Sequence, residues 1–166
     1  RGYNKGKFIQ KVDMIRGIIP DVSLTTDIIV GFPGETDDDF QDTMDIVKYV
    51  EFDSVYMFQF SPRPGTKAYD MEDEFVDQDI IKKRFQHLKD VQTDISEKRL
   101  KRFVGTKQLL LIEKPSKKNN KLLTGKIDSG QITHIDKGNV SIGDIVQVRI
   151  TDSTPCLLYT SPSPRD

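Results

Sequence analysis

The hydrophobic positions of this 166-residue chain follow a helical period in its first two thirds and a strand period afterwards. Residues 5–18, 37–50 and 77–103 repeat apolar side chains every three or four positions, which predicts three amphipathic helices. Residues 23–30 and 54–60 carry short apolar runs, typical of strands buried on both faces. Helices and strands in this order predict parallel strands joined by right-handed crossovers. Two strands do not make a stable sheet, so we expect a slice of a larger α/β barrel or sheet.

The segment 27–36, Asp-Ile-Ile-Val-Gly-Phe-Pro-Gly-Glu-Thr, predicts a strand that runs straight into a glycine turn. Gly31 and Gly34 lack a Cβ, so the backbone there can turn sharply or lie against a ligand. Pro33 prevents the strand from continuing. In α/β folds the turn that follows a strand is where ligands bind, so this turn is the first candidate site.

The helix expected after this turn begins with an acidic run. Thr36 is suited to be its N-cap, and Asp39 stands three positions later, as in a capping box. Asp37–Asp39 lie at the positive end of the helix dipole. We interpret the run as a solvated helix start rather than a metal site, because its side chains point in different directions.

From residue 104 the pattern predicts a small antiparallel β-barrel of OB-like type. Short β-branched or aliphatic runs alternate with Gly and Asn turns, over residues 107–113, 121–127, 131–135 and 144–150. Residues 156–166 turn instead to Ser and Pro and resemble translated adapter sequence. We therefore expect a disordered tail there and a barrel without its last strand.

Composition limits where the protein can act and which kinds of site it can hold. The chain is 31% charged, and no apolar run approaches the ~18 residues of a membrane span. It begins with neither Met nor a signal peptide, so we expect an internal fragment of a cytoplasmic protein. Cys156 is the single cysteine, which excludes an intrachain disulfide and a Cys-based metal site. Residues 1–76 hold 15 acidic and 8 basic side chains, and the remainder is mildly basic, which permits nucleic-acid contact.

Several motifs together resemble the tRNA methylthiotransferases, which are radical S-adenosylmethionine enzymes. They are Arg-Gly-Tyr at 1–3, the segment 27–36, Phe-Asp at 52–53 and Ser-Pro-Arg-Pro-Gly-Thr at 61–66. Pro-Ser-Lys-Lys at 115–118 and Thr-Gly-Lys at 124–126 are similar to the C-terminal TRAM domain of that family, a small RNA-binding β-barrel. The resemblance implies the C-terminal part of a radical-SAM (β/α) barrel over 1–76, a connecting helix over 77–103 and a TRAM domain over 104–155.

The resemblance also implies a reaction. The similarity is greatest to the branch that methylthiolates C2 of N6-isopentenyl-adenosine near the tRNA anticodon. Branches that act on threonylcarbamoyl-adenosine in tRNA or on a ribosomal protein stay open, as does a non-catalytic RNA-binding fragment. The family uses S-adenosylmethionine, [4Fe–4S] clusters, an electron donor and a sulfur source. Its cluster cysteines are not in this sequence, so we expect no catalytic residue, no metal ligand and no activity in this chain alone, which we expect to be monomeric.

For the cofactor pocket, the resemblance points to Asp27, Ile29, Gly31, Gly34 and Arg63. Ile29 would pack near the adenine, and Gly31 would let the backbone approach it. Two alternatives stay open: a tight turn that binds nothing, and a structural acceptor role for Asp27. Arg63 follows a strand, where its guanidinium either holds a carboxylate or phosphate or pairs with the acidic N-terminal half.

For RNA, the candidates are lysines that surround a turn of the small barrel. They are Lys114, Lys117, Lys118, Lys121 and Lys126. Such a group would neutralise tRNA phosphates and make binding depend on salt, whereas the alternative is ordinary surface lysine. Few aromatic residues stand among them, so base stacking is not expected. His87 and His134 are expected to be structural or surface residues.

Overall fold

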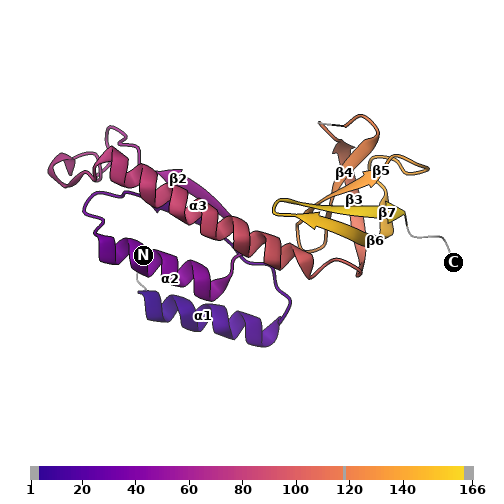
Figure 1. Ribbon diagram of the computed structural model, residues 1–166, viewed down its shortest axis with the longest axis horizontal. Helices are drawn as coiled ribbons and strands as arrows, with labels where there is room; N and C mark the ends of the chain where they lie inside the picture. The colour runs from indigo at the N-terminus through magenta and orange to yellow at the C-terminus, as the bar shows by residue number, and fades with distance from the viewer. Residues whose placement is uncertain (1–3, 118, 163–166) are drawn as a thin grey trace. The chain divides into compact units, whose positions relative to one another are not determined.

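The computed structural model describes residues 4–117 and 119–162, which form two compact units divided between Ile95 and Ser96 (Figure 1). Its architecture is mixed α/β, with a closed five-stranded β-barrel in the second unit. Element order is α1 (Lys5–Ile18), β1 (Thr25–Val30), α2 (Asp37–Val50), β2 (Ser54–Gln59), a 3-10 turn η1 (Glu72–Glu74) and α3 (Gln78–Lys101). The barrel strands follow as β3 (Lys107–Pro115), β4 (Leu122–Ile127), β5 (Ile132–Asp136), β6 (Ile145–Thr154) and β7 (Leu157–Pro162).

The helices of the first unit begin where their capping residues predict. The Asn4 side chain accepts a hydrogen bond from the Lys7 amide and starts α1. Thr36 and Asp39 form the predicted capping box of α2. At α3, the Asp77 carboxylate accepts from the amide of Asp79. Each carboxylate or amide oxygen satisfies backbone N–H groups that have no partner within the helix.

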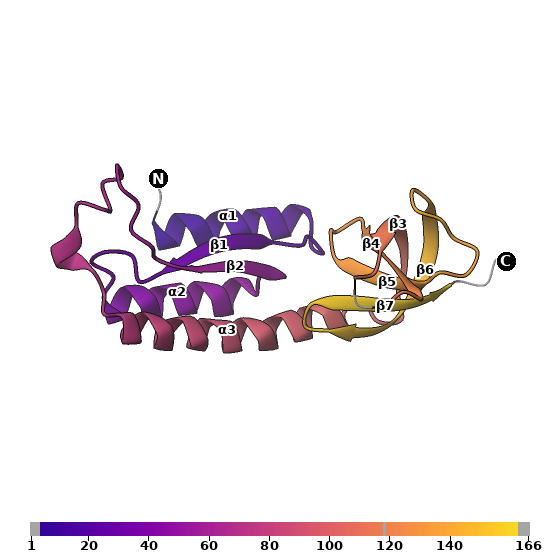
Figure 2. The same cartoon turned by 90° about the horizontal axis from the view of Figure 1, so that it is seen from above.

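β1 and β2 form a parallel pair, as predicted from the strand–helix–strand order, with Asp27 opposite Tyr56 and Ile29 opposite Phe58. One face of this sheet packs into the core of the unit, which is drawn from both strands and all three helices. The core includes Val12, Val30, Met44, Val47, Val50, Phe52, Leu88 and Ile95. The three helices run along the sheet (Figure 2).

The other face of the sheet is open, so the expectation of strands buried on both sides is wrong. Along β1 the exposed residues alternate with covered ones, and Ile29 retains 51% of its accessible surface. Tyr56 and Phe58 on β2 are 60% and 53% exposed. A continuous apolar run does not reveal which face of a strand is covered, because burial depends on what packs against it.

In the second unit the strands close in the order β3-β4-β5-β7-β6. All pairs are antiparallel except β5 with β7, which is parallel. Side chains from every strand fill the interior, together with Leu100 and Phe103 at the end of α3. The strand residues are Leu110, Ile112, Leu123, Ile127, Ile135, Val148, Ile150 and Leu158.

Strand β7 corrects the expectation of a disordered tail and an incomplete barrel. It lies between β5 and β6, and Leu158 is completely buried in the barrel core. Leu157, Leu158 and Tyr159 form a short apolar run, but the Ser and Pro residues that follow it suggested an irregular tail. The remainder of the expected tail, residues 163–166, lies outside the described residues.

Candidate functional site

The glycine turn after β1 is a tight, left-handed bend. Gly31 and Gly34 have φ angles of 77° and 78°, a region that L side chains disfavour. The amide of Glu35 donates to the carbonyl oxygen of Phe32 at 2.9 Å and closes the bend. The amide of Gly34 donates to the carbonyl oxygen of Glu74 at 2.8 Å, so a loop distant in sequence also holds the turn.

The position of Gly31 is set by α3. A Cβ on Gly31 would overlap the side chain of Ile81, which is 1% exposed. At Gly34 a Cβ would meet the Glu74 carboxylate at 2.8 Å. Packing and a positive φ therefore account for glycine at position 31, and the positive φ accounts for it at position 34, both without a ligand. The role of these two residues in cofactor binding stays a prediction.

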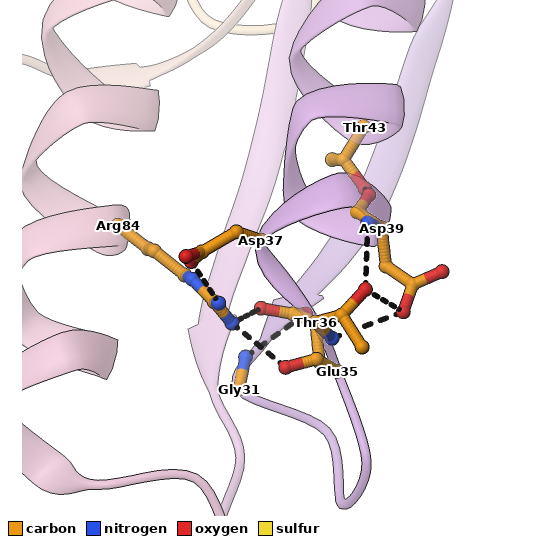
Figure 3. Close-up of polar contacts among 7 residues, drawn as sticks. All are labelled: Gly31, Glu35, Thr36, Asp37, Asp39, Thr43 and Arg84. Carbon is orange, nitrogen blue, oxygen red and sulfur yellow. Dashed lines mark hydrogen bonds and ion pairs between the residues drawn. The ribbon is translucent and has the colours of Figure 1, made fainter.

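Arg84 joins α3 to the start of α2 (Figure 3). Its Nη1 donates to Oε1 of Glu35 at 2.7 Å and to the Glu35 carbonyl oxygen at 3.1 Å, and its Nη2 donates to Oδ1 of Asp37 at 2.6 Å. Burial works to lower the pKa of Arg84, but the hydrogen bonds to Asp37 and Glu35 outweigh it and raise that pKa above its ordinary value. The guanidinium also lies 5.5 Å from the ring centroid of Phe40.

The acidic run at the start of α2 is engaged in these structural contacts. Oδ2 of Asp39 accepts from the Thr36 hydroxyl at 2.7 Å and from the Thr36 amide at 3.0 Å (Figure 3). These two hydrogen bonds lower the pKa of Asp39 below its ordinary value. Asp37 is the partner of Arg84. Helix capping and ion pairing thus account for two of the three carboxylates.

Two of the predicted cofactor residues lie on the open face of the sheet. Asp27 and Ile29 are both exposed on β1 and lead directly to the glycine turn. They also line a pocket of about 360 Å³ together with Phe8 of α1 and Ile46 of α2. Asp27 and Ile29 thus share the exposed face of β1, and Gly31 follows the last residue of that strand. Their role in cofactor binding stays a prediction.

Arg63 lies apart, in the loop after β2, and its side chain is exposed. Its contacts within the described part of the chain run through its carbonyl oxygen, which accepts from the hydroxyl of Thr66 at 2.9 Å. The contact fixes the loop backbone rather than the guanidinium. The role of the Arg63 guanidinium, with a ligand or with an acidic partner, stays a prediction.

On the barrel, three of the predicted lysines cluster at one hairpin. Lys114, Lys117 and Lys121 are exposed around the connection from β3 to β4. Lys118 lies outside the described residues. Lys126 is exposed farther along β4, where it pairs with Leu111 and Ile132. The role of these lysines in RNA binding stays a prediction.

A fourth lysine, Lys137, lies beside this hairpin, and the sequence did not single it out. The amide of Lys137 donates to the carbonyl oxygen of Lys121 at 3.0 Å, and the Lys137 side chain is exposed. Sixteen positions separate these two residues, and only the pairing of β4 with β5 brings them together. The β4–β5 register would have revealed the neighbour, but no local motif marks Lys137.

The two histidines make the kind of contact expected of structural residues. Nδ1 of His134 lies 3.0 Å from the hydroxyl of Thr124, and its ring packs against Tyr159. His87 packs against Phe40 on the neighbouring helix. Both rings thus take part in side-chain packing within their own units.

Neither a metal cluster nor a membrane span is present in the described part of the chain. Across residues 4–117 and 119–162, no three His, Cys, Asp or Glu side chains gather in a group that would hold a metal ion. Over the same residues, no helix has the length and apolar character needed to cross a bilayer.

Comparison with known proteins agrees with both the barrel and the motifs. Residues 101–159 match the family model described as "TRAM domain". The chain is 42% identical over 161 residues to the tRNA-2-methylthio-N(6)-dimethylallyladenosine synthase of Corynebacterium jeikeium, covering 95% of this chain and 31% of the relative. It is 42% identical to the synthase of the same name from Fusobacterium nucleatum, covering 96% of this chain and 36% of the relative.

A third relative, from Acetivibrio thermocellus, carries the same name and is 44% identical over 150 residues, covering 90% of this chain and 31% of the relative. The chain thus spans about a third of the length of the curated relatives it matches. Similarity to these synthases over nearly the whole chain, and to TRAM domains over its β-barrel, confirms the resemblance to the tRNA methylthiotransferases.

Proposed function

We propose that this chain is part of a longer enzyme that adds a methylthio group to C2 of N6-isopentenyl-adenosine near the tRNA anticodon. The observation that carries the proposal is the 42% identity, over 95% of this chain, to a relative named for that modified nucleoside. The barrel that matches the TRAM domain supports a tRNA substrate. With such a substrate, we expect the enzyme in the cytoplasm.

Residues 1–76 would then be the C-terminal part of a radical-SAM (β/α) barrel. The parallel β1–β2 pair with α2 between its strands is the repeating unit of such a barrel. The sheet presents one uncovered face, with Ile29, Tyr56 and Phe58 exposed on it. An interior surface of this kind is covered when the remaining strands close the barrel. Residues 77–103 would connect it to a TRAM domain that begins at residue 104.

The residues present fit S-adenosylmethionine better than they fit an iron–sulfur cluster. The apolar Ile29 is exposed near the carboxyl end of β1, the end at which barrels bind ligands, and Asp27 is exposed two residues before it on the same strand. When bound with its cluster, S-adenosylmethionine would supply the radical that activates the C2–H bond of the target adenosine. A [4Fe–4S] cluster is held by several cysteine thiolates, and this chain has a single cysteine, Cys156, on the second unit. The residues of this chain therefore do not fit the cluster.

Asp27, Ile29, Gly31 and Gly34 would form one wall of the cofactor pocket, and Arg63 would hold an anionic group from the neighbouring loop. The cluster, the electron donor and the sulfur source would act through residues outside this chain. We therefore expect the chain by itself, as a monomer, to be inactive in methylthiolation.

The barrel would bind tRNA through the lysines of the β3–β4 hairpin, with Lys118 and Lys126 as further candidates. Lys114, Lys117, Lys121 and Lys137 are all exposed there. Each lysine that neutralises a phosphate releases a counterion, so binding should weaken steeply as salt is added. A non-catalytic RNA-binding module is the second candidate function, and the closed barrel within this chain favours it.

The activity is tested by expressing the full reading frame in a bacterial strain that lacks tRNA methylthiotransferases. Mass spectrometry of tRNA nucleosides should then show 2-methylthio-N6-isopentenyl-adenosine. Appearance of the methylthio group on threonylcarbamoyl-adenosine or on a ribosomal protein would assign another branch. Absence of all three products with a soluble, cluster-loaded protein would leave the RNA-binding module.

The RNA surface is tested on the 166-residue chain itself. We expect Lys117→Glu together with Lys121→Glu to weaken tRNA binding and to reduce the slope of log K against log salt by roughly 0.7–0.9 for each phosphate that is no longer neutralised. Lys107→Glu is the matched control, since Lys107 is exposed at the other end of β3. An unchanged slope in the double variant would refute this surface.

A further inference from the structure

The carboxylate of Glu35 connects the glycine turn to α3. Its Oε2 accepts a hydrogen bond from the backbone amide of Gly31 at 3.1 Å, while its Oε1 accepts from Nη1 of Arg84 at 2.7 Å (Figure 3). The amide that ends β1 is thus linked to a helix about fifty residues away through one side chain. Both side chains are nearly buried, at 12% exposure for Glu35 and 8% for Arg84.

This arrangement needs the shape of an arginine. Arg84 contacts the side chain and carbonyl oxygen of Glu35 with one nitrogen and Asp37 with the other. A planar guanidinium makes these contacts in a fixed geometry, whereas a lysine ammonium would satisfy them only as a point charge. Because Nη1 of Arg84 donates to both the carbonyl oxygen and the carboxylate of Glu35, it restricts that carboxylate to the orientation that accepts from Gly31.

We infer that Arg84 is a positioning residue that acts through Glu35 to fix the backbone of Gly31 at the cofactor wall. This inference rests on the proposed function, which puts S-adenosylmethionine at this turn. Gly31 has no side chain to restrict its dihedral angles, so its conformation depends on such outside contacts. A turn fixed before the ligand arrives does not have to be ordered on binding, and its affinity is higher for that reason.

The first test measures amide hydrogen exchange in the 166-residue chain. In Arg84→Lys and Glu35→Ala we expect the Gly31 amide to exchange roughly tenfold faster, because its acceptor is displaced or removed. The amides of Met44, Val47 and Val50 in the second half of α2 report whether the unit is still folded. Unchanged Gly31 exchange in these variants, with α2 protected, would overturn the inference.

Two control variants test whether Arg84 orients the Glu35 carboxylate or only attaches α3 to α2. Asp37→Asn removes the negative charge of the 2.6 Å partner of the same guanidinium but leaves the bridge from Glu35 to Gly31 in place. Lys82→Gln removes an exposed ion pair with Asp79 on the same helix. Both should leave Gly31 exchange within about twofold of the unmodified chain. If Asp37→Asn accelerates it as much as Arg84→Lys does, the role of Arg84 is attachment, and the inference fails.

The second test measures the dissociation constant of S-adenosylmethionine in the full-length protein. We expect Arg84→Lys and Glu35→Ala each to weaken binding about tenfold, and the double variant to be no weaker than the weaker single, since both act through one contact chain. Failure of the unmodified protein to bind would overturn the proposed cofactor site. Binding by the unmodified protein and equally by both variants would overturn only the positioning role.

Discussion

Gly31, at the end of β1, lies directly against Ile81 of α3, so that a Cβ on Gly31 would overlap Cγ1 and Cδ1 of that side chain. Gly31→Ala should therefore be strongly destabilising, by about 2 to 4 kcal/mol, from overpacking together with a φ of 77°. Urea unfolding followed by circular dichroism measures the change.

Gly65→Ala is the matched control for this effect. Gly65 has a φ of 83°, but nothing lies within 4 Å of the position of its Cβ. Gly65→Ala should lower the free energy of unfolding only by the backbone strain, about 1 kcal/mol. Ile81→Ala should cost less in the Gly31→Ala background than in the unmodified chain, because it also relieves the overlap. Full additivity of the two changes would contradict the contact.

Substitution of Gly125 should also destabilise the protein, but for a different reason. Its φ is not left-handed, but a Cβ there would overlap the carbonyl oxygen of Leu111 on the neighbouring strand. We expect Gly125→Ala to force β3 and β4 apart and to lower the free energy of unfolding of the barrel by about 1 to 3 kcal/mol. Gly130→Ala is the comparison: nothing lies near the position of its Cβ, but its φ of 85° should cost about 1 kcal/mol of backbone strain. A Gly125→Ala effect no larger than this would count against the close approach.

Strand β7 should be essential to the barrel of this chain. Leu158→Ala removes a side chain with no exposed surface and should cost about 2 to 5 kcal/mol, whereas the half-buried Leu157→Ala should cost less. Deleting residues 156–166 should remove one neighbour from each of β5 and β6. A truncated chain whose barrel amides keep their protection in hydrogen exchange would show that β7 does not stabilise it.

The capping box of α2 should make stability depend on pH in the acid range. The pKa of Asp39 is lowered by its hydrogen bonds to Thr36, so its carboxylate favours folding above the unfolded pKa of about 3.9. That stabilisation should be lost as pH falls through the lower, folded pKa. Thermal unfolding of Asp39→Asn and the unmodified chain should therefore differ near neutral pH and converge at low pH.

Asp38→Asn is the control for this titration, because Asp38 shares the first turn of α2 and its dipole but not the capping box. A difference between Asp39→Asn and the unmodified chain that persists unchanged at the lowest pH would exclude the carboxylate as its source.

Local chemistry made the first half of the fold predictable. α1 spans Lys5–Ile18 and α2 spans Asp37–Val50, the residues expected from Asn4, Thr36 and the apolar spacing. Cap residues act within a few positions, so a sequence reveals them. The parallel β1–β2 pair followed from the order of elements. The domain boundaries at 76 and 103 stay predictions, whereas the barrel extends past residue 155 through β7.

What escaped prediction depends on contacts distant in sequence. Arg84 is 49 positions from Glu35, and Lys137 meets Lys121 only through strand pairing. The open face of β1 was missed because an apolar run shows that a strand is hydrophobic but not which neighbours it has. In β7, Ser161 and Pro162 outweighed the apolar Leu157 and Leu158 in the sequence.

The place of β7 between β5 and β6 has a consequence for synthesis. Because β7 is the last of the five strands to leave the ribosome and the one that joins two earlier strands, β3 to β6 must wait with two unpaired edges until it emerges. Closure of this barrel therefore waits for the last of its five strands. Until then the newly made barrel strands depend on each other, and on any chaperone at the tunnel exit, to avoid pairing with other chains.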